Sequence, residues 1–315
     1  MRKYPSARWP VRLAGGISER WMPMTGTDMD DDQKLWARAQ NYVLSRQSAD
    51  SGFCFYRVWG VEESTAPDTF YAVAMLRLWG MAIPHRAELI RWLQSLQDDQ
   101  GRYSSLTNAS FGVRALSLLA DTPLRDPRPH LLNWATQATG HKNAASSETL
   151  RDWQRCVQLQ RMLAPDEPLP EIMRSGAEAI LHGMEAAAGG FGSHPNLVDS
   201  GIAWALQRLL GQPLRPQDRI FLHACEDATL GLRLSPDGAS TRLEAIFWGI
   251  LQMAHLHIAP RYPEAVMAYV RACQPVNGGF GRRAGAIATL EGTFHAVMIA
   301  AGLSRNPLLQ TLTGI

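Results

Sequence analysis

The chain has 315 residues, 46% of them hydrophobic and 19% charged, which is a normal globular balance in a chain long enough to bury a large core. The formal net charge of +2 is spread over interspersed acids and bases, so neither a nucleic-acid surface nor a polybasic membrane patch is expected. Four distant cysteines without a CxxC pair exclude a disulfide framework, and no apolar run reaches the ~18 residues of a membrane span.

The N-terminal segment, residues 1–32, is rich in proline and glycine and is predicted to be an irregular extension on the surface or in an opening. No apolar signal-peptide core follows its basic start, so together with the reduced cysteines we expect a cytoplasmic protein. The acidic run at 28–32 precedes a helix predicted from about Gln33 to Arg46, where acidic side chains stabilise a helix N-terminus.

One motif then recurs along the chain: an aromatic residue, an aliphatic residue, three further residues, Gln, and a later Gly-aromatic pair. It is clearest at 92–103, 42–53 and 269–280, and relaxed copies fill the gaps. The copies are spaced by roughly 45 residues, which is typical of a repeat architecture. The Gln or Glu positions of the six repeats are Gln47, Gln97, Gln137, Glu185, Glu226 and Gln274.

A second helix is predicted in each repeat, after the Gly-aromatic turn. These helices are apolar on most faces, as at 245–251, and are therefore expected to be buried, whereas the first helices carry a polar face, as at 86–94. Six such hairpins predict an all-α fold, an (α/α)6 toroid over residues 33–303, with 304–315 as a tail. The second helices are predicted to begin near Asp68, Asn108, Asp152, Asp199, Glu244 and Glu291.

The repeat resembles that of two enzyme groups. The Gln-containing motif resembles the Gln-Trp motif of squalene-hopene and oxidosqualene cyclases, and residues 51–80 and 278–281 resemble the repeat of protein prenyltransferase β subunits. The resemblance covers about residues 33–303. It implies an isoprenoid-handling, prenyltransferase-like enzyme with an apolar central cavity for a hydrophobic isoprenoid-type ligand, and a helical partner subunit.

Two alternatives stay open, because members of this superfamily differ in activity. The chain is either a class II-type terpenoid cyclase that uses an Asp acid, or a non-catalytic toroid binding module that has lost the zinc and diphosphate sites of the transferases. Fold resemblance by itself does not choose among the three.

A zinc site is implied by the resemblance to prenyltransferase β subunits, which bind zinc through an Asp, a Cys two residues later and a distant His. Asp199 and His295 match the Asp and the His, but the Cys position is Gly201, which cannot ligate. The basic diphosphate-binding positions fall on Ser193 and Asn196. Catalytic zinc normally has three protein ligands, so the competing interpretation is that Asp199 caps its helix and His295 lines the cavity.

A cyclase acid is the second implied site. Class II cyclases protonate their substrate with the central Asp of an Asp-x-Asp-Asp motif, and 28–31 matches this spelling with Asp30 at its centre. Such an acid must be kept protonated by an apolar site and by neighbouring carboxylates. Ordinary helix capping competes with this interpretation of Asp30, and Asp68 at an inner-helix start is a second acid candidate.

Aromatic side chains of the inner helices are the candidate ligand-binding residues. Aromatic faces stabilise cations, and an apolar pocket suits a small hydrophobic ligand. Packing between the helix layers is the alternative for any one of them. The candidates are Phe70, Tyr71, Phe111, Trp153, Trp204, Phe247, Trp248 and Phe294.

Overall fold

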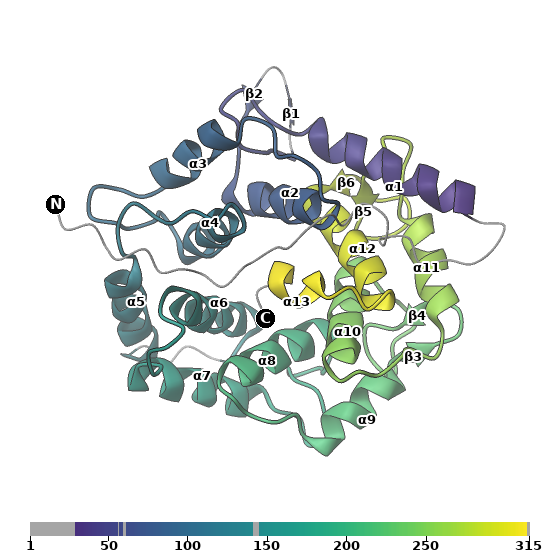
Figure 1. Ribbon diagram of the computed structural model, residues 1–315. Helices are drawn as coiled ribbons and strands as arrows, with labels where there is room; N and C mark the ends of the chain where they lie inside the picture. Colours follow the sequence, from purple (N-terminus) through teal and green to yellow (C-terminus); the bar gives the residue numbers. More distant parts are fainter. Residues whose placement is uncertain (1–28, 56, 59–60, 141–144, 314–315) are drawn as a thin grey trace.

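The computed structural model describes residues 29–55, 57–58, 61–140 and 145–313, which form two concentric layers of helices (Figure 1). The outer layer consists of α1 (Met29–Leu44), α3 (Arg86–Ser95), α5 (Arg128–Gly140), α7 (Glu171–Met184), α9 (Pro216–Ala224) and α11 (Pro263–Ala272). The inner layer consists of α2 (Ala66–Leu78), α4 (Leu106–Leu118), α6 (Ser147–Leu163), α8 (Leu197–Leu209), α10 (Leu243–His255) and α12 (Leu290–Leu303).

The inner helices close a ring. Each contacts the next one along the chain, and α12 returns to contact α2. Outer and inner helices alternate along the chain, so the fold is the predicted (α/α)6 toroid (Figure 1). A short helix, α13 (Leu308–Thr313), lies within the predicted tail and packs against α12 and α2. Within the described residues no helix is long and apolar enough to cross a membrane.

The recurring motif forms the turn that follows an outer helix. Gln97 pairs with Tyr103 in an antiparallel bridge, and its side-chain amide donates to the carbonyl oxygens of Gly101 and Arg125, each at 3.0 Å. Arg125 lies three residues before the start of the next outer helix, α5, so the motif ties successive repeats together. Gln274 does the same across the closure of the ring, because its amide donates to the Leu35 carbonyl in α1 at 2.9 Å.

Glutamate replaces glutamine where the next repeat presents a donor instead of a carbonyl. Glu185 forms an ion pair with Arg215 at the start of α9, and Glu226 accepts a hydrogen bond from the Arg261 backbone N–H at 2.6 Å. Gln137 differs from the other five, because it lies inside α5, which continues to Gly140. The predicted motif register is therefore wrong in the third repeat.

Two helix starts also differ from the sequence prediction. α1 begins at Met29, so the acidic run from Asp30 onward lies within the helix, and Asp32 forms an ion pair with Arg271 of α11 at 2.9 Å. α6 begins at Ser147, which places Asp152 more than a turn inside it.

Strands are restricted to three two-residue hairpins in the described part of the chain, which follow the outer helices. Each hairpin pairs two antiparallel strands of two residues. The pairs are β1 (Arg57–Val58) with β2 (Val61–Glu62), β3 (Glu226–Asp227) with β4 (Gly231–Leu232), and β5 (Phe280–Gly281) with β6 (Ala288–Thr289).

Candidate functional site

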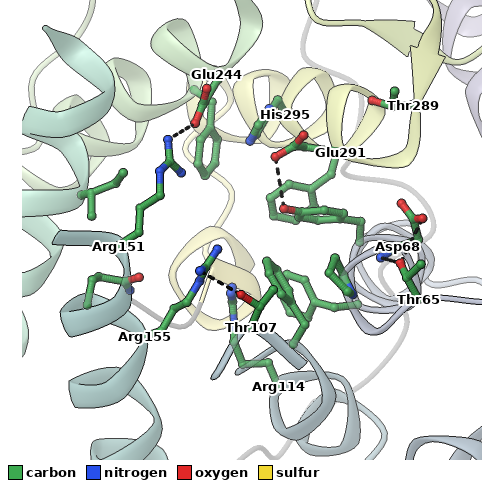
Figure 2. Close-up of a pocket in the computed structure, with 18 of the residues that line it drawn as sticks. Thr65, Asp68, Thr107, Arg114, Arg151, Arg155, Glu244, Thr289, Glu291 and His295 are labelled. Atoms are coloured by element: carbon green, nitrogen blue, oxygen red, sulfur yellow. Dashed lines mark hydrogen bonds and ion pairs between the residues drawn. The ribbon is translucent and has the colours of Figure 1, made fainter. Parts of the chain in front are cut away.

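A cavity of about 380 Å³ lies inside the ring, at the N-terminal halves of the inner helices. The sequence predicts an apolar cavity, but the lining is aromatic and charged, so that prediction is wrong in its polarity. Arginines from α4 and α6 face a second wall of aromatic and acidic side chains from α2, α10 and α12 (Figure 2). We call these the basic wall and the aromatic-acidic wall.

The basic wall is built mainly from one stripe of α6. Arg151, Gln154, Arg155 and Gln158 all line the cavity. Their spacing of three, four and seven residues places them on one face of a helix. α6 has the polar face that the other inner helices lack, and the ring turns this face toward the cavity.

The two α6 arginines are partly paired. Arg151 donates from Nη2 to Glu244 at 2.7 Å, and Arg155 donates from Nη1 to Thr107 at 3.0 Å and to Asp152 at 3.1 Å. A guanidinium has five N–H donors. Each arginine therefore uses one terminal nitrogen in these contacts and keeps further donors for a ligand.

Arg114 of α4 completes the basic wall. Its guanidinium lies 3.9 Å from the centroid of the Phe70 ring, a cation–π geometry. Burial lowers the pKa of Arg114 to about 10, an effect that Tyr71 opposes. The side chain is therefore still charged at neutral pH.

Aromatic rings pack edge and face against one another in the opposite wall. Between ring centroids, Tyr71 lies 5.0 Å from Phe294, and Phe247 lies 5.8 Å from Phe294. Phe111 of α4 borders this wall, 5.3 Å from Tyr71. His295 stacks on Phe247 at 4.8 Å. The predicted ligand-binding residues that line the cavity are Phe70, Tyr71, Phe111, Phe247, Trp248 and Phe294.

The acidic members of this wall come from the first turns of α2, α10 and α12. Burial by itself would raise the pKa of Glu244, but Arg151, with His295 and Arg242, holds it below its usual value. Glu291 contacts the hydroxyl of Tyr71 at 3.4 Å. Burial raises the pKa of this Tyr71 hydroxyl well above its usual value, and the charge of Glu291 adds to the effect.

Asp68 lies at the edge of the cavity, as the acid hypothesis requires. Its carboxylate accepts hydrogen bonds from the Phe55 backbone N–H at 3.1 Å and from the Thr65 hydroxyl at 3.0 Å. Burial raises the pKa of Asp68, these two hydrogen bonds oppose the rise, and the charge of Glu291 adds to it. Asp68 therefore has the environment of an acid that is harder to ionise than usual.

Two other predicted acids lie elsewhere. Asp199 is 8% exposed in the seam between α6 and α8, where its carboxylate accepts from Ser147 at 2.9 Å and from Asn196 at 2.8 Å. The N-cap residue of α8 is Asn196. Asp30 lies in the first turn of the outer helix α1, its side chain is outside the described residues, and α1 contributes nothing to the described cavity lining.

The residues present do not fit a catalytic zinc ion. A Cβ atom added to Gly201 would lie 2.5 Å from the Cβ of Trp248, so the indole occupies the space that a cysteine side chain needs. Asp199 is hydrogen-bonded in the α6–α8 seam, whereas His295 lines the cavity. Among the described residues no group of three His, Cys, Asp or Glu side chains could hold a metal.

Two predicted aromatic ligand-binding residues belong to the core between the layers, so for them the prediction is wrong. Trp153 packs edge-on against Trp134 of α5 at 5.1 Å, and Trp204 against Phe221 of α9 at 6.4 Å. Both point outward from the inner helices, because the apolar faces of these helices must cover the outer layer.

The three arginines of the basic wall are not among the residues predicted from the sequence. For Arg151 and Arg155 the signal was present as a polar stripe on a helix that the repeat assigns to the inner layer. Arg114 has no such signal, since it is a single charge in an apolar helix.

The comparison with known families gives one match. The model of a family described as the prenyltransferase alpha-alpha toroid domain matches residues 18–137 and 221–312. No curated protein matches the chain significantly.

Proposed function

Since the chain belongs to the prenyltransferase alpha-alpha toroid family, we propose that it is an isoprenoid-handling enzyme that binds a prenyl diphosphate in the central cavity. The family is prenyltransferase-like or cyclase-like, and the choice of substrate and reaction is our proposal. The observation that supports it is that the basic wall and the aromatic-acidic wall face each other across one cavity.

The two walls match the two parts of such a ligand. Arginine guanidinium groups bind phosphate oxygens with charge-assisted, often paired hydrogen bonds. The aromatic rings offer an apolar surface for the prenyl chain and electrostatic stabilisation for a developing allylic cation. At about 380 Å³ the cavity falls in the range of small-molecule sites.

Prenyl transfer is the leading reaction in this proposal. The arginines would neutralise the charge that develops on the departing diphosphate, while Phe294 and Tyr71 face the chain. No step is assigned to zinc, because the ligand set is incomplete. The transferase form includes a helical partner subunit, which co-purification followed by light scattering would detect.

Cyclisation is the second candidate, and the position of Asp68 favours it. Asp68 lies at the cavity beside Phe70 and Tyr71, and burial raises its pKa. A carboxylic acid whose pKa is raised next to aromatic faces is better suited to protonate an alkene, and the rings then stabilise the cation. In this version Asp68→Asn abolishes the cyclic product but leaves substrate binding intact.

The test is titration of the protein with farnesyl diphosphate, farnesol and inorganic diphosphate, followed by product analysis with a panel of prenyl diphosphates and squalene-like polyenes. We expect farnesyl diphosphate to bind more tightly than either fragment, because it engages both walls. Binding without turnover of any substrate would leave a binding module. If none of these compounds binds, the isoprenoid proposal is wrong.

A further inference from the structure

Charge neutralisation differs between the carboxylates of the cavity. Glu244 forms ion pairs with Arg151 at 2.7 Å and with Arg242 at 3.2 Å. Within the described part of the chain, Asp68 and Glu291 have hydrogen-bond donors but no ion-pair partner. Glu291 is exposed and Asp68 is half-buried, so the α2–α12 end of the cavity presents two carboxylates without an ion-pair partner in the described part of the chain.

His295 is a second, independent polar feature at this end of the cavity. It is only 7% exposed, lines the cavity, and has no hydrogen-bond or ion-pair partner among the described residues. Figure 2 shows it on α12 near Glu291, on the edge of the cavity. The two residues are four positions apart, so they share one face of the helix.

The protonation state of His295 makes it an acceptor. Burial lowers its pKa, against the opposing effect of Glu291 and Glu244. A neutral imidazole has one nitrogen that accepts a hydrogen bond. Its ring is held in place by the stack on Phe247 at 4.8 Å, so the acceptor is positioned before any ligand arrives.

The surroundings of these acceptors fit a cation. The rings of Tyr71, Phe294 and Phe247 form the adjacent wall, and the π faces of aromatic rings attract cations. Arg282 and Arg283 border an open hollow that shares Glu291 with the cavity, but neither forms an ion pair with Glu291 in the described structure. An anion placed here would meet two carboxylates, so this end disfavours the diphosphate.

We infer that the α2–α12 end of the cavity binds the primary ammonium group of an apolar amine. An ammonium group has three N–H donors and no acceptor. Glu291 and His295 accept two of its hydrogen bonds, and the aromatic rings cover the apolar body. The inference rests on the proposed function in one respect: if that function holds, the amine is bound in the same cavity, beside the prenyl chain.

The test uses benzylammonium as the cationic probe and benzyl alcohol as its neutral counterpart, with isothermal titration calorimetry. We expect benzylammonium to bind at least about tenfold more tightly, because a charge-assisted hydrogen bond is worth more than a neutral one. Glu291→Gln and His295→Phe should each weaken benzylammonium binding by about tenfold; the phenylalanine keeps the stack on Phe247 and removes the acceptor.

The control is Glu264→Gln, which removes an exposed first-turn acid of the outer helix α11 and should leave the affinity unchanged. Equal affinity for the alcohol and the ammonium, or no loss in Glu291→Gln, would overturn the inference. Titration of the same variants with farnesyl diphosphate separates the two proposals. If benzylammonium binds and farnesyl diphosphate does not, the isoprenoid function fails and the ammonium site stands; the reverse result removes only the ammonium site.

Discussion

On the α4–α6 side of the cavity, Arg155 has Asp152 and Thr107 as partners, and Arg151 reaches across to Glu244. On the α12 side, Glu291 contacts only the Tyr71 hydroxyl in the described structure, and His295 only stacks. Both walls lie at the N-terminal halves of inner helices. The difference shows that one repeated scaffold can present opposite charges on facing walls, because only the side chains on the inward stripe of each helix change.

The largest expected effect comes from breaking the basic wall. Arg151→Gln with Arg155→Gln should weaken farnesyl diphosphate binding by about 100-fold, since each charge-assisted contact contributes about a factor of ten or more. Farnesol affinity should change little, because farnesol has no diphosphate. Calorimetry measures both ligands, and Arg91→Gln, an exposed outer-helix arginine, is the matched control. A parallel loss for farnesol would mean that the variant has lost the cavity itself.

The next largest effect is a loss of stability where Trp248 of the aromatic-acidic wall packs against α8. Gly201→Ala should lower the free energy of unfolding by about 1–3 kcal/mol, because its Cβ would overlap Trp248. Gly112→Ala is the matched control in α4, where the nearest atom is 3.4 Å from the added Cβ. Removal of a glycine from a helix interior makes that control neutral or stabilising. Chemical denaturation measures both, and equal stability of the two variants would contradict the assigned packing of Trp248.

A smaller effect is expected from the protonation of His295. Its folded-state pKa lies below the unfolded value of 6.5, so as the pH falls below that value the unfolded state takes up a proton that the folded state does not. Stability is therefore lost on acidification, by at most about 1.4 kcal/mol per pH unit. His295→Phe should lose less stability than the wild type between about pH 7.5 and pH 5.5.

Thermal unfolding at the two pH values measures this difference. Glu244 remains ionised throughout that interval, because its pKa is held below its usual value. The wild type and His295→Phe would lose equal stability if the imidazole of His295 were freely protonated in the folded protein.

The smallest effect is expected from the addition of zinc to the purified protein. Trp248 fills the position that a third ligand would need, so added zinc should leave the unfolding temperature unchanged and metal analysis should find no stoichiometric zinc. One zinc per chain that is lost in His295→Ala would show that the aromatic-acidic wall holds a metal instead of an ammonium group.

The contents of the cavity were predictable only in part. Phe70, Tyr71 and Phe294 were predicted to line it because they lie on inner helices, and they do. Trp153 and Trp204 have the same sequence context but point to the outer layer. Sequence assigns a helix to a layer, but the rotation of an inner helix about its own axis depends on how it packs against both neighbours.

The toroid follows from the repeat pattern of the sequence. Six helical hairpins, with apolar second helices and polar-faced first helices, require an inner and an outer layer. In five of them the Gln or Glu of the motif ties the repeat to the next one. Which side chains meet in the cavity depends on the closed ring. Arg151 and Glu244 are 93 residues apart, and Tyr71 and Glu291 are 220 apart. Such pairs form because ring closure brings the first turns of different helices to one cavity. Local sequence patterns do not predict contacts between residues that are so far apart in the chain.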